Sequence, residues 1–140
     1  TGTNKETAAQ KNAGTLEVEY VPQGTLAERI RAYGAGLGGV LTPTGLGTVI
    51  QEGKQIVNVD GKDYILEKPL KADIAFLRAN IVDEEGNMVF LGTTQNFNPL
   101  MAMAADYVVV EAEKLVKNGE IAPEQIHASG IFVDGIYLEK

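Results

Sequence analysis

YVVVEAE, residues 107–113, holds an unbroken apolar run that is typical of a strand covered on both of its faces. Before this run, NFNPLMAMAAD (residues 96–106) predicts a helix, with Asn98 as the N-cap and Pro99 at the first helical position. After it, GIFVDGIYLEK (residues 130–140) predicts a last strand. A covered strand that follows a helix and precedes another strand indicates an α/β fold.

Two β-hairpins are predicted nearer the start of the chain. In QIVNVDGKDYIL (residues 55–66), Asp60 and Gly61 form a two-residue turn between strands rich in isoleucine, valine and tyrosine. A second hairpin is predicted across IAFLRANIVDEEGNMVFLG (residues 74–92), with its turn near residues 85–87. Because βα segments and hairpins occur together, we expect an α/β fold with a mixed, mostly parallel sheet, flanking helices and β-hairpins.

The N-terminal part predicts a helix, a strand and a second helix. Residues 3–6 fit a capping box and Gly14 suits a helix end, so a short helix is expected over residues 5–12. LEVEYV (residues 16–21) alternates apolar and acidic residues, as a strand with one solvated face does. A second capping box at residues 25–28 predicts the start of a helix with one apolar face. That face carries Leu26, Ile30 and Tyr33.

Composition excludes several classes of protein. With 140 residues, of which 44% are hydrophobic, and no linker or repeat, residues 1–140 are expected to form a single domain. The net charge is −7 and the arginines are only Arg29, Arg31 and Arg78, so nucleic acid is not an expected partner. The chain has no cysteine and only one histidine, His127, which argues against a zinc site. Neither an apolar run of about 18 residues nor a signal peptide is visible, so we expect no membrane partner and a cytoplasmic protein.

The glycine-rich stretch RAYGAGLGGVLTPTGLG, residues 31–47, matches the dinucleotide-binding pattern through Gly34, Gly36 and Gly39. Its context is reversed, because a predicted helix precedes the pattern and no predicted helix follows it. Gly34 is expected to cap the preceding helix in a left-handed conformation. The other glycines fit two interpretations equally, a packing loop or a loop whose backbone lines a binding site. These glycines are Gly36, Gly38, Gly39, Gly45 and Gly47, with Thr42 and Thr44 between them.

Few side chains suggest catalysis. His127 could be a general base, although a structural or surface histidine is the favoured interpretation. Ser129 lies only two residues from His127, which argues against a Ser-His-Asp triad. Glu111 and Glu113 follow the predicted strand and could be catalytic, but solvated or ion-paired carboxylates are favoured. Asn96 carries an amide that could hold a carboxylate or a carbonyl group. No catalytic residue is therefore predicted in this chain.

Five blocks of the sequence, taken together and in order, resemble the alpha subunit of the two-subunit 3-oxoacid CoA-transferases, which include acetate/acetoacetate and butyrate/acetoacetate types. The most specific match joins VPQGTLAERIRA (residues 21–32) to the glycine-rich stretch. The five blocks are residues 16–55, 60–79, 86–90, 96–106 and 119–136.

This resemblance implies transfer of CoA between a CoA thioester and a short-chain acid through a glutamyl-CoA intermediate. In the family, the nucleophilic glutamate belongs to the beta subunit, within a Ser-Glu-Asn-Gly motif that this sequence lacks. We therefore expect a non-nucleophilic alpha subunit with a beta-subunit partner, coenzyme A as substrate, and no permanently bound cofactor or metal. Two departures stand out. First, the family's N-terminal G-G-F-x-x-x-G-x-P segment is absent, so residues 1–140 correspond to the C-terminal two-thirds of the alpha subunit. Second, Gln95 stands where the family commonly has an arginine.

The resemblance also implies a substrate-side wall for the active site. Gln23 follows a predicted strand end, where its amide could hydrogen-bond the carboxylate of the acid substrate. The predicted substrate-binding residues are Gln23, Gly36, Gly38, Gly39, Thr42, Thr44, Gly45 and Asn96. Two alternatives stay open at this point. One is a fold-related sugar-phosphate isomerase or ligand-binding domain that acts without a partner. A basic phosphate pocket would be expected there, and the presence of only three arginines argues against it. The other alternative is a purely structural piece that binds no ligand.

Overall fold

The structure is a computed structural model that describes residues 4–139. The helices are α1 (Lys5–Ala13), α2 (Gln23–Gly34) and α3 (Asn98–Met101). The strands are β1 (Val40–Thr42), β2 (Ile56–Val59), β3 (Lys62–Glu67), β4 (Ala72–Asp83), β5 (Met88–Val89), β6 (Ala105–Val116) and β7 (Gly135–Leu138). Short 3-10 helices are η1 (Val49–Gln51), η2 (Gly92–Gln95), η3 (Pro123–Gln125) and η4 (Gly130–Phe132). No helix in this described part is long and apolar enough to cross a membrane.

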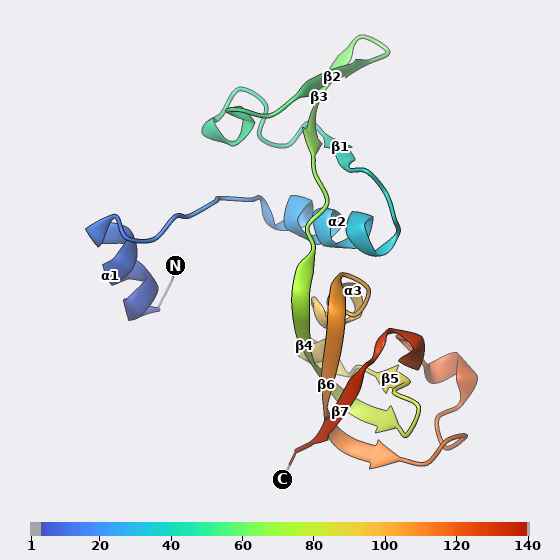
Figure 1. Cartoon of the computed structure of the whole chain (residues 1–140). Helices are drawn as coiled ribbons and strands as arrows, with labels where there is room; N and C mark the ends of the chain where they lie inside the picture. The colour runs from blue at the N-terminus through green and yellow to red at the C-terminus, as the bar shows by residue number, and fades with distance from the viewer. Residues whose placement is uncertain (1–3, 140) are drawn as a thin grey trace.

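The strands form two sheets, with α2 between them in the view of Figure 1. One sheet has the order β5-β4-β6-β7, in which β6 is parallel to both β4 and β7, whereas β5 is antiparallel to β4. This mixed, mostly parallel sheet confirms the predicted α/β class. The other sheet has the order β1-β3-β2 and is antiparallel throughout. The hairpin of β2 and β3 therefore does not join the four-stranded sheet. Its strand β3 pairs with β1 on its other side, which makes a second, separate sheet.

Both predicted hairpins are confirmed. Asp60 and Gly61 have φ angles of 52° and 80° between β2 and β3, as a type I′ turn requires. The turn between β4 and β5 contains Gly86 with φ 87°. The Asp83 carboxylate closes this second turn by accepting hydrogen bonds from the backbone N–H groups of Glu85 and Asn87, at 3.1 and 2.9 Å. Local turn chemistry therefore set the position of each hairpin.

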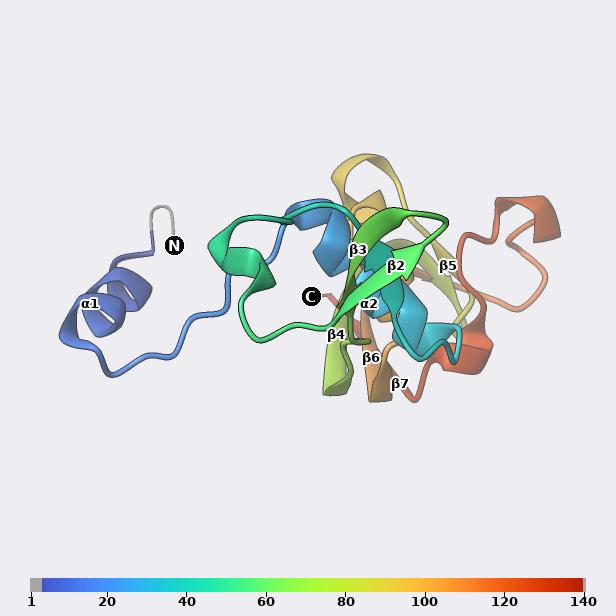
Figure 2. The same cartoon turned by 90° about the horizontal axis from the view of Figure 1, so that it is seen from above.

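The core of the four-stranded sheet lies on one face only. On β6, Val108, Val110 and Ala112 are at most 2% exposed, whereas Tyr107 on the opposite face is 49% exposed. The prediction that residues 107–113 are covered on both faces is therefore wrong for this structure, because no described element packs on the second face. Figures 1 and 2 show α3 and β5 on one side of β4 and β6, and α1 apart from both sheets. The buried cluster comprises Ala75, Leu77, Ala79, Val82, Met88, Phe90, Ala102, Val108, Val110, Ala112 and Ala128.

The N-terminal elements differ in detail from the predicted ones. Helix α1 is confirmed, with Gly14 left-handed at its end, but its N-cap is Asn4, whose side chain accepts from Thr7 N at 3.0 Å. Thr3 lies outside the described residues. Residues 16–21 form no strand, because no described strand lies beside them to complete a ladder. This segment is tied to α2 by an ion pair of 2.9 Å between Glu19 and Arg29.

Helix α2 begins at Gln23, two residues before the predicted N-cap. Pro22 occupies the N-cap position with φ −55°, and its carbonyl accepts the backbone N–H of Leu26 at 2.9 Å. The capping box predicted at residues 25–28 is therefore wrong, since proline already fixes the entry into the helix. As a result, Thr25 lies inside the first turn and is 6% exposed.

Two further capping predictions are wrong. Gly34 is the last residue of α2, and the left-handed residue beyond it is Gly36, with φ 68°. A Cβ on Gly34 would lie 2.5 Å from the Cβ of Met103, so close packing rather than a left-handed turn requires this glycine. Asn98 is the first residue of α3, not its N-cap. Its amide donates to the Thr94 carbonyl at 3.0 Å, and its oxygen accepts from the Arg78 N–H at 3.2 Å.

The last strand is shorter than predicted. Of residues 130–140, the first three form η4, and β7 covers Gly135–Leu138. The Asp134 carboxylate accepts from Val108 N at 2.7 Å, which fixes the start of β7 against β6.

Lys71 and Asp106 form an exposed ion pair of 2.5 Å beside the start of β4. The hydrogen bond to Asp106 raises the pKa of the Lys71 ammonium above its usual value of 10.5. A raised folded-state pKa gives a contribution to stability that is fully present below pH 10.5 and is lost as the pH rises through the folded value. We expect Asp106→Asn to remove a small part of the alkaline destabilisation. Urea unfolding of the unsubstituted protein and of Asp106→Asn, at neutral pH and above pH 10.5, measures how much free energy of unfolding each loses on alkalisation. An equal loss in the two proteins would contradict the prediction.

Candidate functional site

A groove of about 370 Å³ lies at the N-terminal end of α2. Its walls come from the start of α2 and from the segment around β1. They comprise Pro22, Gly24, Thr25, Ala27, Glu28, Thr42 and Thr44. No side chain caps this end of α2, so the backbone N–H groups of its first turn have no side-chain acceptor among the described residues. The positive end of the helix dipole therefore faces a groove that also carries hydroxyl groups.

Thr25 is the buried polar residue of this groove. It is 6% exposed, and its hydroxyl has no hydrogen-bond partner among the described residues. No fully buried side-chain oxygen or nitrogen of the described residues lacks a partner, so this hydroxyl must be accessible. The groove that Thr25 lines is the space it can reach. The sequence did not single out Thr25 as a binding residue, because its pattern there predicts an N-cap.

Two of the predicted binding residues, Thr42 and Thr44, line the groove. The Thr42 hydroxyl accepts from the Thr44 N–H at 3.2 Å, which leaves its own proton free to be donated to a ligand. Gln23 is exposed at the first position of α2, next to the lining residue Gly24. The structure thus brings three of the predicted residues to one end of one helix.

The other predicted binding residues lie elsewhere. Gly36 and Gly38 are exposed after the C-terminal end of α2, a helix of twelve residues and therefore about 18 Å long. Asn96 is exposed after η2, beside the four-stranded sheet. None of these three residues lines the groove. Their part in substrate binding stays a prediction.

The packing interpretation explains two glycines of the stretch. Gly39 has φ 152°, and a Cβ there would lie 2.7 Å from the Glu67 carbonyl oxygen. Gly45 has φ 97°, and a Cβ there would lie 2.7 Å from Ile50. Gly38, in contrast, has neither a left-handed backbone nor any described atom within 4 Å of its Cβ position, and the same holds for Gly24 in the groove. Space beside these two glycines is open to a ligand or a partner chain.

Gly39→Ala is expected to destabilise the protein by about 2 kcal/mol, because alanine is strained at this φ and its Cβ would meet backbone at the end of β3. Gly38→Ala, one residue away, should change stability by less than about 0.5 kcal/mol. Urea unfolding followed by circular dichroism measures both changes. Equal losses in the two variants would show that the close approach at Gly39 has no special cost.

His127 has a structural role in this fold. Its Nδ1 accepts the backbone N–H of Phe90 at 3.0 Å, which places the proton of the neutral ring on Nε2. Glu113 is exposed and accepts from the Asn80 amide at 2.9 Å, which agrees with the interpretation of a solvated carboxylate rather than an ion-paired one. Gln95, at the position where the resemblance implies a common arginine, donates its amide to the Phe90 carbonyl at 2.9 Å. These contacts lie in and beside the four-stranded sheet, and none of them involves a residue that lines the groove at α2.

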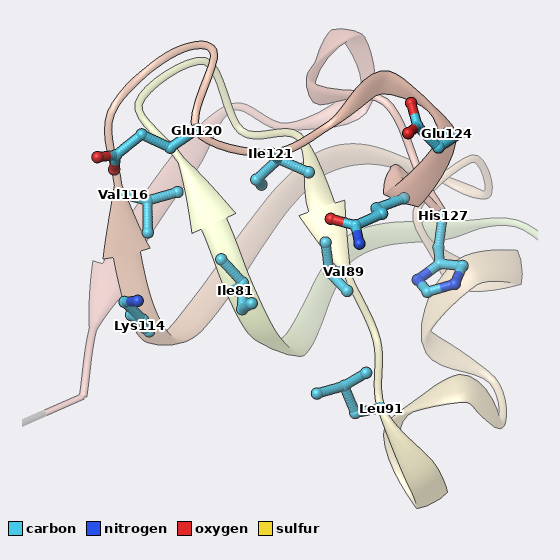
Figure 3. A pocket seen from close by; sticks show the side chains of 10 residues that line it. Ile81, Val89, Leu91, Lys114, Val116, Glu120, Ile121, Glu124 and His127 are labelled. Atoms are coloured by element: carbon cyan, nitrogen blue, oxygen red, sulfur yellow. The ribbon is translucent and has the colours of Figure 1, made fainter.

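A larger cavity of about 670 Å³ lies beside His127 and is shown in Figure 3. Isoleucine, valine and leucine side chains form its floor, and Lys114, Glu120, Glu124 and His127 stand around it. No cluster of three or more metal-ligating side chains occurs among the described residues. This cavity offers no nucleophile paired with a base, so it is a weaker candidate than the α2 groove.

Comparison with known proteins identifies the family. A model of the family described as coenzyme A transferase matches residues 1–139. The chain belongs to the coenzyme A transferase family. The predicted resemblance to the alpha subunit is confirmed by relatives that bear this name. They include the alpha subunit of acetate CoA-transferase from Escherichia coli K12, which is 50% identical over 139 residues, and the acetoacetyl-CoA:acetate/butyrate CoA transferase alpha subunit of Clostridium acetobutylicum, which is 51% identical over 138 residues.

The chain is shorter than these family members. The matches cover 99% of this chain but 63% of each relative, so the chain spans less than two thirds of their length. Solved structures give the same relation. An acyl-CoA transferase of E. coli O157:H7 in a thioester complex with CoA superposes with a TM-score of 0.86 at 25% identity, over 99% of this chain and 31% of that one. Glutaconate coenzyme A-transferase of Acidaminococcus fermentans shares the fold with a TM-score of 0.87 at 18% identity, over 99% and 50% of the two chains.

Proposed function

We propose that this chain is the non-nucleophilic alpha part of a heteromeric, cytoplasmic CoA-transferase, which moves CoA between an acyl-CoA and a short-chain (3-oxo)acid. The observation that carries the proposal is the uncapped start of α2, which faces a groove lined by three threonines. A carboxylate is the ligand that a helix N-terminus and free hydroxyl donors favour. In this proposal Gln23, Thr25, Thr42 and Thr44 hold the acid substrate.

The nucleophile is proposed to be a glutamate of a beta subunit. The carboxylate in the groove of this chain, Glu28, pairs with Arg31 at 3.2 Å. A partner glutamate would attack the thioester carbonyl and release the CoA thiolate, which forms an acyl-glutamyl anhydride. The thiolate then attacks the glutamyl carbonyl, releases the first acid and leaves glutamyl-CoA. The second acid reverses these two steps and departs as a new thioester, so coenzyme A is a substrate and no resident cofactor takes part.

The charge of the chain supports this division of roles. Its net charge is −7, and all three of its arginines are already paired with carboxylates, Arg29 with Glu19, Arg31 with Glu28 and Arg78 with Glu139. A surface of this kind attracts CoA phosphates weakly. We therefore assign the CoA phosphates to the beta subunit, and the acid substrate to this chain.

A chimera tests the proposal directly. Residues 1–139 replace the matched region of the E. coli alpha subunit, and the chimera is produced with the E. coli beta subunit. Transfer of CoA from acetoacetyl-CoA to acetate is expected from the pair, and none from the chimera or the beta subunit by itself. Cleavage of the thioester intermediate with hydroxylamine should mark a beta-subunit glutamate. A mark on a glutamate of this chain, or no transfer by a correctly assembled pair, would overturn the proposal.

Thr25→Val in the same chimera separates binding from folding. The substitution keeps the shape of a buried side chain whose hydroxyl has no partner in the described structure, so stability should hardly change. We expect KM for the carboxylate acceptor to rise about tenfold, with a smaller effect on kcat. Thr93→Val, at an exposed position of η2 outside the groove, is the matched control. An unchanged KM in Thr25→Val would remove this hydroxyl from the substrate site.

A further inference from the structure

The face of α2 that forms one wall of the groove carries very small side chains. Gly24 and Ala27 are three positions apart on the helix, so they are neighbours on one face, and both line the groove. Glu28 follows on the same face and lines it too. A Cβ on Gly24 would meet no described atom within 4 Å, so the space beside this face is open. Along α2, the width of the groove therefore depends on the single methyl group of Ala27.

Polarity changes along this wall. Groups that donate hydrogen bonds lie at the start of α2, where no side chain caps the first backbone N–H groups and where Thr25 is buried. At Ala27 the wall is a methyl group, and at Glu28 it is a carboxylate that pairs with Arg31 at 3.2 Å. An acid thus finds a place for its carboxylate at the start of the helix and an apolar place for its carbon chain beside Ala27.

The rise of the helix relates this wall to the length of an acid. Each residue of an α-helix adds 1.5 Å along its axis, so Ala27 lies about 4.5 Å beyond Gly24. This is close to the span from the carboxylate carbon to the methyl group of butyrate. A longer chain would reach Glu28 and displace water from its carboxylate, which is unfavourable. The wall is therefore apolar over the length of roughly four carbons and charged beyond it.

We propose that Ala27 sets the longest acid that the groove accepts, at roughly four unbranched carbons. The inference rests on the proposed function, which gives the α2 groove an acid substrate, and it adds the residue that decides which acids fit. The carbon chain of the acid runs along α2 from Gly24 toward Ala27. A larger side chain at position 27 fills the place of the last carbons of butyrate, and a smaller one admits a longer chain.

Ala27→Leu narrows the groove and is tested in the chimera with the E. coli beta subunit. Ala27 is half-buried and leucine is a good helix former, so α2 should keep its fold. We expect the ratio of kcat/KM for butyrate to kcat/KM for acetate to fall about tenfold or more, as a misfit of a methylene group or more in a pocket predicts. The acyl donor, acetoacetyl-CoA, is the same in every assay. The ratio is taken within each variant, so a change in the amount of folded enzyme cancels.

Ala27→Gly widens the groove and should have the opposite effect. It gives space for about one more methylene group, so the ratio of kcat/KM for pentanoate to kcat/KM for butyrate should rise about fourfold. Ala35→Leu is the matched control for the larger side chain. Ala35 is exposed at the C-cap of α2, at the other end of the helix from the groove, and it gains the same atoms. Its butyrate-to-acetate ratio should equal that of the unsubstituted chimera.

The two proposals fail in different ways. A chimera that assembles with the beta subunit but transfers CoA to no acid overturns the proposed function, and this inference with it. A chimera that transfers CoA and keeps its butyrate-to-acetate ratio in Ala27→Leu overturns the inference alone. So does an equal fall in Ala35→Leu, since a general disturbance of α2 would then set the ratio. If circular dichroism shows that Ala27→Leu does not fold, an unchanged pentanoate-to-butyrate ratio in Ala27→Gly overturns the inference.

Discussion

Gly130→Ala is expected to destabilise the protein by about 3 kcal/mol, which is the upper range for overpacking a rigid site. A Cβ on Gly130 would lie 2.0 Å from the carbonyl oxygen of Glu85 and 2.9 Å from the backbone nitrogen of Asn87. Both atoms belong to the backbone of the turn between β4 and β5, so no side-chain rotation can relieve the overlap.

The turn itself is held from several directions. Asp83 is 3% exposed and accepts from the backbone N–H groups of Glu85 and Asn87 and from the Asn87 amide, the last at 2.8 Å. The oxygen of the same Asn87 side chain accepts the Gly130 N–H at 2.9 Å. Moving the turn to make room for alanine therefore breaks hydrogen bonds of a buried carboxylate, which raises the cost further.

Gly135→Ala is the control for this prediction. The nearest atom to a Cβ on Gly135 would be the Tyr107 hydroxyl at 3.7 Å, an ordinary contact, so stability should change by about 0.5 kcal/mol at most. Urea unfolding of both variants measures the difference. If Gly130→Ala unfolds at the same urea concentration as Gly135→Ala, the turn is more adaptable than its hydrogen bonds indicate.

Local signals explain which parts of the fold could be predicted from the sequence. Asp60-Gly61 and Gly86 set the two hairpins because a turn depends only on neighbouring residues. The α2 start was misplaced by a pattern of the same local kind, since residues 25–28 match a capping box while Pro22 already begins the helix. Because of that error, Thr25 was assigned as an N-cap and was not predicted to be a residue of the groove. Recognition that proline fixes the entry into α2 would have placed Thr25 inside the first turn.

Contacts between distant segments could not be predicted in this way. Gly34 and Gly39 are required because Met103 and Glu67 approach them, and neither approach leaves a trace in the neighbouring sequence. The apolar run of residues 107–113 correctly predicts a strand, yet none of the described residues covers its second face. Thr42 and Thr44 were grouped with Gln23 through the family resemblance rather than through their spacing; the two threonines line the groove, and the substrate-binding role of all three residues stays a prediction.

Glu67→Met is expected to destabilise the protein by about 3 kcal/mol, because it removes one partner of a buried ion pair. Glu67 is 2% exposed, and its Oε1 accepts from the Lys54 ammonium at 2.7 Å. The Lys54 side chain is 21% exposed and can turn partly toward water, which places the loss at the lower end of the range for broken buried pairs. Val40 pairs with Glu67 across the sheet, so amide protection of β1 and β3 should fall as well.

The double variant Glu67→Met/Lys54→Met decides whether charge or packing causes this loss. Because the second substitution removes the uncompensated ammonium, the double variant should be more stable than Glu67→Met alone, and a four-protein cycle in urea gives the coupling energy. Glu28→Gln, which breaks the exposed pair with Arg31, is the surface control and should cost between about 0 and 1 kcal/mol. If the double variant is as unstable as Glu67→Met, the side-chain shape at the end of β3, and not its charge, holds the three-stranded sheet together.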